Sequence, residues 1–283
     1  MAKSGIHLPY VDKLLDRFSQ ADHDSILAFG RHMHAGYWAD PEQANSSIED
    51  FAQASEELCC RICQIAKVRK NMAVLDVGCG FGGTIANINS RFSPIKLVGL
   101  NIDPRQLQIA SQQVIAQPLN SVEFIEGDAC QLPFDDESFD VVLAIESILH
   151  FSNRSNFFQE AKRVLRPGGR LVLTDLVLSG PTQPLGQIMD LVSKRYVFRS
   201  HGNSDLSCSL KDYQAIAART GLVFHYFEDI TANTLPSYAV IQQLKRKRRE
   251  KFQDREGATT MSILYWLSRL RFLRYLICEF LAQ

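Results

Sequence analysis

A glycine-rich loop is the part of the sequence whose residue types and spacing most clearly indicate chemistry. The stretch VLDVGCGFGGT covers residues 74–84 and carries glycines at 78, 80, 82 and 83. Glycine lets backbone N–H groups approach a ligand closely. Gly78, Gly80 and Gly83 fit the dinucleotide pattern G-x-G-x-x-G, but Asp76 stands two residues before the first of them. A carboxylate there would face phosphate, so it favours a ligand with a cationic end.

The elements that must position this loop alternate between strands and helices over residues 71–180. MAVLDVG is a continuous apolar run ending at glycine, as expected of a buried parallel strand. The runs IKLVGLNI, VEFIEGDA, FDVVLAIES and GRLVLTDLVL predict further strands, most of them separated by helices. The alternation predicts an α/β fold with right-handed crossovers and a parallel sheet. The loop then lies at the carboxyl edge, where open α/β sheets bind ligands.

The chain divides into five regions of different character. Residues 1–70 are predicted to be helical, and residues 71–180 form the core. Residues 181–210 interrupt the alternation. Residues 211–244 complete the sheet, with VFHYFEDI and SYAVIQQL predicted as an antiparallel pair of strands. Residues 245–283 begin with the basic block KRKRREK and continue as a predicted apolar helix that packs on its own domain or a dimer partner, or touches a membrane surface or the entrance of an apolar substrate.

Composition limits the class of protein. Lys+Arg and Asp+Glu number 31 each, so no global basic field is available to attract nucleic acid. No apolar run approaches the roughly 20 residues of a membrane span, and no signal peptide is evident. The seven cysteines suit a reducing cytoplasm. Cys59, Cys60 and Cys63 are interpreted as small apolar residues of a helix, because no partner pair stands at metal-ligand spacing.

Three motifs in order carry a resemblance to a known family. LDVGCGFGG, GDACQLPFDDESFDVV and RVLRPGGRLVLTD resemble, in sequence and spacing, motifs of the class I S-adenosylmethionine-dependent methyltransferases, over residues 70–180. The resemblance implies a Rossmann-like, seven-stranded, mostly parallel sheet with an antiparallel last strand. It also implies S-adenosylmethionine as cofactor, which has an ammonium, a sulfonium and no phosphate, and so suits Asp76.

The resemblance also implies which residues bind the cofactor. Asp128 and the backbone near Ala129 are expected at the adenine amino group. Most members carry an acid after the second strand that pairs with the ribose hydroxyls; here Asn101 stands there, and its amide can still pair with a hydroxyl. The complete predicted set is Tyr37, Asp76, Gly78, Cys79, Gly80, Asn101, Ile102, Gln106, Asp128, Ala129 and Glu146.

Further features are similar to a subgroup that methylates sugars, tocopherols and other natural products. These are the neutral Asn101, GYW at residues 36–38 and ES…H at residues 146–150. The subgroup implies a helical N-terminal lid, with Tyr37 near the methionine end of the cofactor, and a substrate cap at residues 181–210. Trp38, Tyr196 and His201 are the predicted acceptor contacts.

A histidine and an aspartate are the predicted catalytic residues. His150 follows the fourth predicted strand and titrates near neutrality, so it is a candidate base. Asp175, at the end of LVLTD, is expected to orient His150 or to hold the acceptor. His32 and His34 have no third ligand in the sequence pattern, so no metal is predicted.

The predicted function is methyl transfer from S-adenosylmethionine to O or N of a small, lipophilic or aromatic natural-product acceptor. The alternatives are C-methylation of a prenyl lipid or phenol, and a non-catalytic S-adenosylmethionine-binding protein. An NAD-dependent dehydrogenase would explain the glycines but not Asp76. A nucleic-acid methyltransferase would carry an N-P-P-Y-like run after the fourth strand, where this chain has AIESILH.

Overall fold

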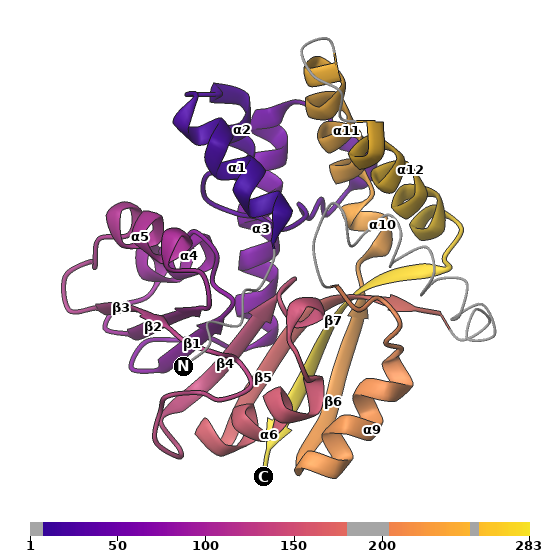
Figure 1. Ribbon diagram of the computed structural model, residues 1–283. Coiled ribbons are helices and arrows are strands. Elements are labelled where there is room, and N and C mark those ends of the chain that lie inside the picture. Colours follow the sequence, from indigo (N-terminus) through magenta and orange to yellow (C-terminus); the bar gives the residue numbers. More distant parts are fainter. Residues whose placement is uncertain (1–7, 180–203, 250–254) are drawn as a thin grey trace.

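A mixed β-sheet forms the centre of the molecule (Figure 1). The computed structural model describes residues 8–179, 204–249 and 255–283, and over these the chain forms a seven-stranded sheet in the order β3-β2-β1-β4-β5-β7-β6. The strands are β1 (Ala73–Val77), β2 (Lys96–Asn101), β3 (Ser121–Glu126), β4 (Phe139–Ile145), β5 (Leu165–Leu178), β6 (Leu222–Asp229) and β7 (Leu273–Ala282). The pairs among β1 to β5 are parallel, and β7 is antiparallel to both β5 and β6. The predicted α/β fold with an antiparallel last strand is confirmed.

Helices cover both faces of this sheet. On one face lie α3 (Ile48–Ile65), α4 (Gly83–Arg91) and α5 (Pro104–Gln113), and on the other lie α6 (Arg154–Val164) and α9 (Leu210–Thr220). All five residues of β1 are buried, with Val74 packed among residues of α3 and α4, and Leu75 among residues of α6 and α9. A strand buried on both faces reads as a continuous apolar run, which explains why MAVLDVG was recognisable.

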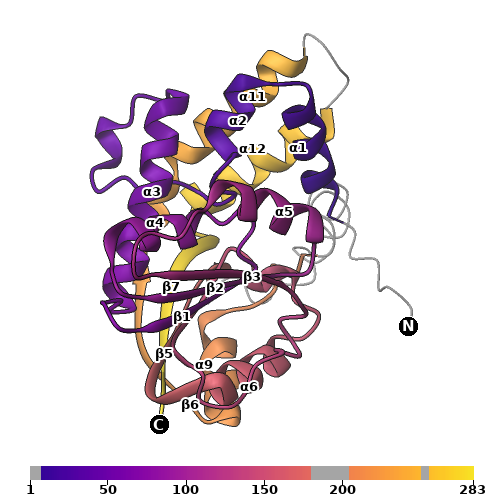
Figure 2. The ribbon, with the colours of Figure 1, turned by 90° about the vertical axis from the view of Figure 1, so that its left-hand side faces the viewer.

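A group of helices lies beyond the edge of the sheet at which β1 and β4 end (Figures 1 and 2). These upper helices are α1 (Pro9–Ser19), α2 (His23–Phe29), α11 (Pro236–Arg249) and α12 (Arg255–Arg269). Val240 and Leu244 of α11 pack with Ala28 of α2 and Phe51 of α3. The short helices η1 (Pro41–Gln43), η2 (Ile148–His150) and α10 (Thr231–Thr234) complete the elements of the described residues. No helix among the described residues is both long enough and apolar enough to span a membrane.

The structure corrects two sequence predictions in the last third of the chain. SYAVIQQL, predicted as a strand, lies in α11, where Pro236 occupies the first turn and the buried Val240 and Leu244 are one turn apart. The predicted tail helix ends at Arg269, and residues 273–282 form β7 instead. Because β7 hydrogen-bonds to β5 on one side and β6 on the other, sheet pairing satisfies its backbone along both edges.

Candidate active site

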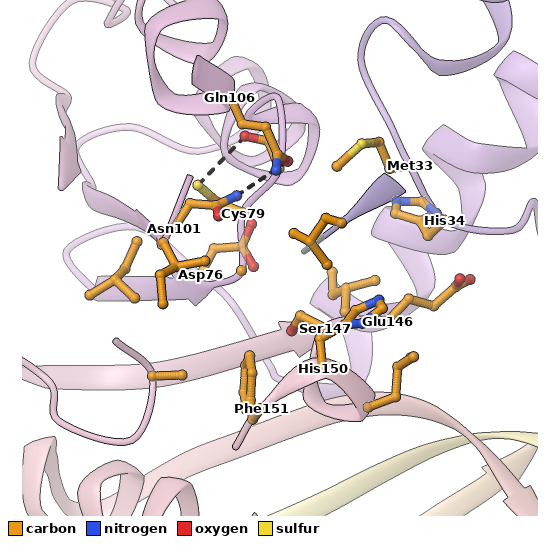
Figure 3. A pocket seen from close by; sticks show the side chains of 18 of the residues that line it. Met33, His34, Asp76, Cys79, Asn101, Gln106, Glu146, Ser147, His150 and Phe151 are labelled. Carbon is orange, nitrogen blue, oxygen red and sulfur yellow. Dashed lines mark hydrogen bonds between the residues drawn. The ribbon is translucent and has the colours of Figure 1, made fainter. Parts of the chain in front are cut away.

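A cavity of about 850 Å³ lies where β1, β2 and β4 end. Figure 3 shows side chains from these strand ends, from the segment after α2 and from η2 pointing into it. Of the predicted cofactor-binding residues, all except Tyr37 line this cavity. They are Asp76, Gly78, Cys79, Gly80, Asn101, Ile102, Gln106, Asp128, Ala129 and Glu146.

Asp76 is the most unusual polar group of the cavity. It lies in β1 with 1% of its surface exposed, and its Oδ2 atom has no hydrogen-bond partner among the described residues. Burial raises its pKa to about 7. A buried carboxylate oxygen without a partner is costly unless a donor or cation reaches it. The cavity therefore presents a carboxylate oxygen that can accept a hydrogen bond from a positively charged group.

The glycine loop has a backbone conformation and a close approach that require glycine. Gly78 has a φ of +80°, and a Cβ atom there would lie 2.4 Å from Cβ of Ser147. Gly80 has a φ of +55°, and its Cβ would lie 2.9 Å from Cε of Met33. The amides of Gly78 and Cys79 donate to the carbonyl oxygen of Leu100, at 2.7 and 3.1 Å. The loop is thereby fixed against β2 with its backbone open to the cavity.

Two amide side chains stand at the end of β2. Asn101 donates from Nδ2 to Oε1 of Gln106 at 3.4 Å, and its Oδ1 accepts from the backbone amide of Asp103 at 3.1 Å. Both amides line the cavity and are almost fully buried. They offer hydrogen-bond donors and acceptors at the place where the resemblance implies that the ribose hydroxyls of S-adenosylmethionine bind.

Glu146 joins three parts of the fold. It follows β4 with a φ of +46°, and its Oε1 accepts hydrogen bonds from the backbone amide of Ala35 at 2.7 Å and from the hydroxyl of Tyr275 at 2.5 Å. Burial raises the pKa of this carboxyl group. Glu146 thus fixes the segment after α2 to β4 and β7 at the wall of the cavity.

His150, the predicted base, lies where two cavities meet. Its ring stacks on Tyr10 with 5.7 Å between centroids, and its Nδ1 is 3.3 Å from Oγ of Ser204. Besides the first cavity, His150 lines a second one of about 250 Å³ between the upper helices and β7. The residues that line both cavities are Tyr10, Met33, His34, Glu146, Leu149, His150, Ser204 and Leu206.

The second cavity is mostly apolar, and the sequence predicted only one part of its wall, the tail helix as an alternative entrance for an apolar substrate. Its walls include Leu14 of α1, Ile241 of α11, Leu264 of α12 and Leu176 of β5. In the sequence these residues read only as the apolar faces of separate helices and of a strand. Their convergence comes from tertiary packing, and no local signal could have identified it.

The structure places Asp175 away from His150, so the predicted partnership is not met. Its Oδ2 accepts from the hydroxyl of Tyr213 at 2.5 Å and from Arg154 at 3.3 Å, and its Oδ1 accepts from the amide of Leu176 at 2.8 Å. The residue is 1% exposed and does not line either of the two cavities. Among the described residues, Asp175 therefore belongs to a buried network between β5, α6 and α9.

Neither aromatic residue of the GYW motif reaches either cavity, which corrects two further predictions. Trp38 is buried against Phe51 and donates from Nε1 to Asp50 at 3.0 Å. Tyr37 packs against the core under α3, with its amide bonded to the carbonyl of Ala54 at 2.8 Å. The motif anchors the segment after α2, and so places Met33 and His34 at the cavity. The predicted acceptor contacts Tyr196 and His201 lie outside the described residues.

The lining of the first cavity fits S-adenosylmethionine. Asp76 offers its unpaired oxygen to an ammonium group, and Asn101 and Gln106 offer amides to hydroxyl groups. Asp128 and Ala129, which the resemblance places at the adenine amino group, also line the cavity. A pyrophosphate would instead meet the charge of Asp76. The donor set therefore agrees with the cofactor that the motifs imply.

Comparisons with known proteins agree with this cavity. Residues 75–173 match the family model of the methyltransferase domain. The methyltransferase GfsG of Streptomyces halstedii is 33% identical over 223 residues, which cover 78% of this chain and 77% of that protein. The 27-O-demethylrifamycin SV methyltransferase of Amycolatopsis mediterranei is 31% identical over 233 residues, 81% of each protein.

A solved structure shares the fold over the whole length. Geranyl diphosphate C-methyltransferase from Streptomyces coelicolor A3(2), solved with Mg²⁺, geranyl diphosphate and S-adenosyl-L-homocysteine, superposes with a TM-score of 0.69. The match covers 99% of this chain and 100% of that one, at 17% identity. With the family match and the relatives, the protein belongs to the class I S-adenosylmethionine-dependent methyltransferases and is an enzyme that methylates small molecules.

Proposed function

We propose that the enzyme methylates an oxygen or nitrogen atom of a lipophilic or aromatic natural product held in the second cavity. The observation that carries this proposal is the junction of the two cavities at His150 and Met33. The first cavity has the lining of a cofactor site, and the second is apolar. An acceptor in the second cavity would therefore present its reacting atom at the junction, with its apolar body away from water.

The residues at the junction suit the removal of a proton. S-adenosylmethionine, when bound, supplies a methyl group on a sulfonium centre that a nucleophile can attack directly. The protein then needs to position the acceptor and take its proton. His150 is held by its stack on Tyr10 and by the contact with Ser204. A hydroxyl or ammonium group of the acceptor is the group that such a base would deprotonate.

The relatives support a natural-product acceptor. One is named for O-methylation of a rifamycin, and both match this chain across the core and beyond it. For this chain the acceptor class rests on the apolar lining of the second cavity. Carbon methylation of a phenol is the alternative, because an ionised phenol can be attacked at oxygen or at ring carbon.

A transfer assay tests the proposal. The enzyme is incubated with S-adenosylmethionine and matched phenols, alcohols and amines with long or short apolar tails, and formation of S-adenosylhomocysteine is measured. We expect turnover that increases with apolar size, and mass spectrometry of the product then distinguishes O-, N- and C-methylation. Binding of the cofactor without turnover of any acceptor would instead favour the non-catalytic alternative.

A pair of variants tests the place of the acceptor. Ile241→Trp fills part of the second cavity, whereas Leu27→Trp lies on the exposed face of α2. We expect the first variant to raise the KM for the acceptor while cofactor binding is unchanged, and the second to leave both constants unchanged. Equal behaviour of the two variants would place the acceptor elsewhere.

We further propose that the N-terminal segment acts as a lid and that residues 181–210 form the substrate cap. Leu8 and Tyr10 line the first cavity from the N-terminal side, and residues 204–207, which belong to the expected cap, line it as well. A cytoplasmic location is supported by the cysteines, all seven of which are free thiols.

The end of α12 supports a peripheral contact with a membrane or a second copy of the chain. Trp266 and Leu270 are 55% and 58% exposed there, beside Arg269 and Arg271. An apolar patch with flanking arginines suits an anionic lipid surface. Sedimentation with anionic vesicles would detect a membrane contact, and light scattering in solution would detect a dimer.

A further inference from the structure

Three side chains that commonly bind metals converge beneath the wall of the first cavity. His32 and His34 come from the segment after α2, and Cys59 comes from the middle of α3. All three are buried, and one ligand atom from each lies within 4.8 Å of the others. Sγ of Cys59 is 3.6 Å from Nδ1 of His32 and 3.5 Å from Nε2 of His34. Cys59 supplies the third ligand that the sequence pattern lacked.

The histidine rings are oriented by contacts on their far sides. Nδ1 of His34 is 2.8 Å from the carbonyl oxygen of Ala35, which can only accept, so that nitrogen carries the proton. Its Nε2 then presents a lone pair to Cys59.

His32 is turned in the same way toward Cys59. Its Nε2 lies 3.0 Å from Oε1 of Glu56, although the ring is rotated out of hydrogen-bond alignment. A carboxylate cannot donate, so the proton of a neutral His32 belongs on Nε2. Its Nδ1 then presents a second lone pair to the same sulfur atom. Metal-binding histidines usually donate their other N–H to a carbonyl or a carboxylate, as His34 does to Ala35, whereas Nε2 of His32 only approaches Glu56 closely.

With both rings neutral and protonated on their far nitrogens, the cluster has one thiol hydrogen for two imidazole lone pairs. The thiol of Cys59 carries one hydrogen, and two imidazole lone pairs face it. The hydroxyl of Thr84, at 3.6 Å from the sulfur, can donate to the sulfur but cannot satisfy both rings. In that neutral state one buried nitrogen faces sulfur without a proton, which is unfavourable. A cation bound by a thiolate and two imidazoles would satisfy all three groups.

We propose that His32, His34 and Cys59 bind a zinc ion. Bond lengths of about 2.3 Å to sulfur and about 2.0–2.1 Å to nitrogen place sulfur and nitrogen about 3.6 Å apart in a tetrahedral site. The two observed S···N distances, 3.5 and 3.6 Å, already have this value. The fourth position is left to water. The inference concerns these residues alone and does not rest on the proposed acceptor.

The surroundings compensate the charge that such a site would carry. A zinc ion with one thiolate has a net charge of +1, and carboxylates of Glu56 and Asp76 lie nearby. Oε1 of Glu56 also lies 2.9 Å from Nε of Arg31, and its Oε2 accepts from the side-chain amide of Asn87 at 2.7 Å. The site would fasten the segment that carries Met33 to α3 and to Thr84 in the first turn of α4, and so stabilise the cofactor wall.

Metal analysis of the full chain, prepared without a polyhistidine tag, tests this inference. After incubation with zinc and desalting, we expect close to one equivalent of zinc per chain in the wild type and in Cys63→Ser, a buried cysteine one turn further along α3. Cys59→Ser and His34→Gln should lose at least nine-tenths of it. Circular dichroism of each variant shows whether it has folded.

Cobalt substitution provides a test that needs no variant. Wild-type protein stripped by a chelator and loaded with Co²⁺ should show the ligand-field bands of a tetrahedral site and a thiolate-to-cobalt charge-transfer band. Thermal melting of the stripped protein should begin at a lower temperature and recover with zinc. Wild-type protein that retains no zinc, or that takes up cobalt without the thiolate band, would overturn the inference.

Discussion

At the scale of single residues, His150 is the group whose replacement should separate chemistry from binding. His150→Ala removes the proposed base but no part of the loop or of the Asn101 site. We expect kcat to fall by about 10²–10⁴-fold, the usual contribution of a positioned base. The dissociation constant of S-adenosylhomocysteine, measured by calorimetry, should be unchanged. Unchanged turnover with an acceptor found in the transfer assay would remove His150 from the mechanism.

We expect Asp76 to make cofactor binding depend on pH. Burial raises its pKa from 3.8 to about 7, so in the absence of ligand the folded state favours the protonated carboxyl group. This group therefore contributes most to stability below its unfolded pKa, and the contribution is lost as the pH rises through about 7. The ammonium group of a bound cofactor would instead favour the ionised form of Asp76. We expect the affinity for S-adenosylhomocysteine to weaken below pH 7, approaching about tenfold per pH unit.

The variant Asp76→Asn tests whether this carboxylate is responsible. Calorimetry between pH 5.5 and pH 8 should show weaker binding at pH 8 and a nearly flat profile in the variant. The thiols of Cys59 and Cys79 do not contribute, because burial raises their pKa well above this range. A variant with the same slope as the wild type would assign the pH dependence to another group.

At the scale of elements, a buried ion pair holds α6 and α9 against β5. Arg154 and Asp175 are 8% and 1% exposed, and Tyr213 of α9 donates to the same carboxylate. Arg154→Met leaves Asp175 buried without its charge partner. We expect a loss of about 3–5 kcal/mol in the free energy of unfolding at pH 7.5. Arg166→Met, which breaks an exposed pair with Asp140, should cost about 1 kcal/mol or less.

Arg154→Met should be less destabilising in acid than at pH 7.5. Burial raises the pKa of Asp175 to about 6 even though Arg154 opposes the shift. Below that pH the carboxyl group is protonated, so the charge that the Met variant leaves unpaired disappears. Urea denaturation at pH 7.5 and at pH 5 should therefore show a smaller difference between variant and wild type at pH 5. An equal or larger difference at pH 5 would mean that the cost is packing and not charge.

The sequence predicted those elements and site residues that a local pattern of residue types marks. The glycine loop, Asp76 and Asn101 were predicted because each lies at or just after the end of a buried strand, and the chemistry depends on residue type at that point. Helix and strand are harder to distinguish in a short apolar run that is buried on both faces. Residues 273–282 were therefore assigned to a helix, although Leu276, Cys278 and Phe280 pack on the α6 side as alternating strand residues do.

Contacts between segments that are distant in the sequence could not be predicted from local sequence patterns. Asp175 has a site-like position in the sequence, and only the placement of Arg154 and Tyr213 shows that it is structural. The second cavity needs α1, α11 and α12 to meet over β7. Cys59 likewise reaches His32 and His34 only when α3 packs beside the segment after α2. Each of these sites depends on tertiary packing that the spacing of residues does not encode.

At the scale of the whole molecule, the sheet is completed by a strand that is inserted between two earlier ones. β7 pairs with β5 from Arg170 to Leu178 and with β6 from Leu222 to Asp229. Until β7 is in place, β5 and β6 each have an unpaired edge, and apolar residues of α6 and α9 lack the cover that Phe280 gives. The half of the sheet beyond β4 therefore cannot form stably before residues 273–282 are added.

Deletion of residues 271–283 should consequently abolish cooperative unfolding. Loss of β7 removes hydrogen bonds from two strands and exposes the core on the α6 side. A control with Trp266→Ser and Leu270→Ser changes exposed side chains of the same region and should melt within a few degrees of the wild type. Thermal melts followed by circular dichroism compare the two. A truncated chain that melts cooperatively and binds S-adenosylhomocysteine would show that residues 72–178 and their helices fold independently, with β7 only an addition to the sheet.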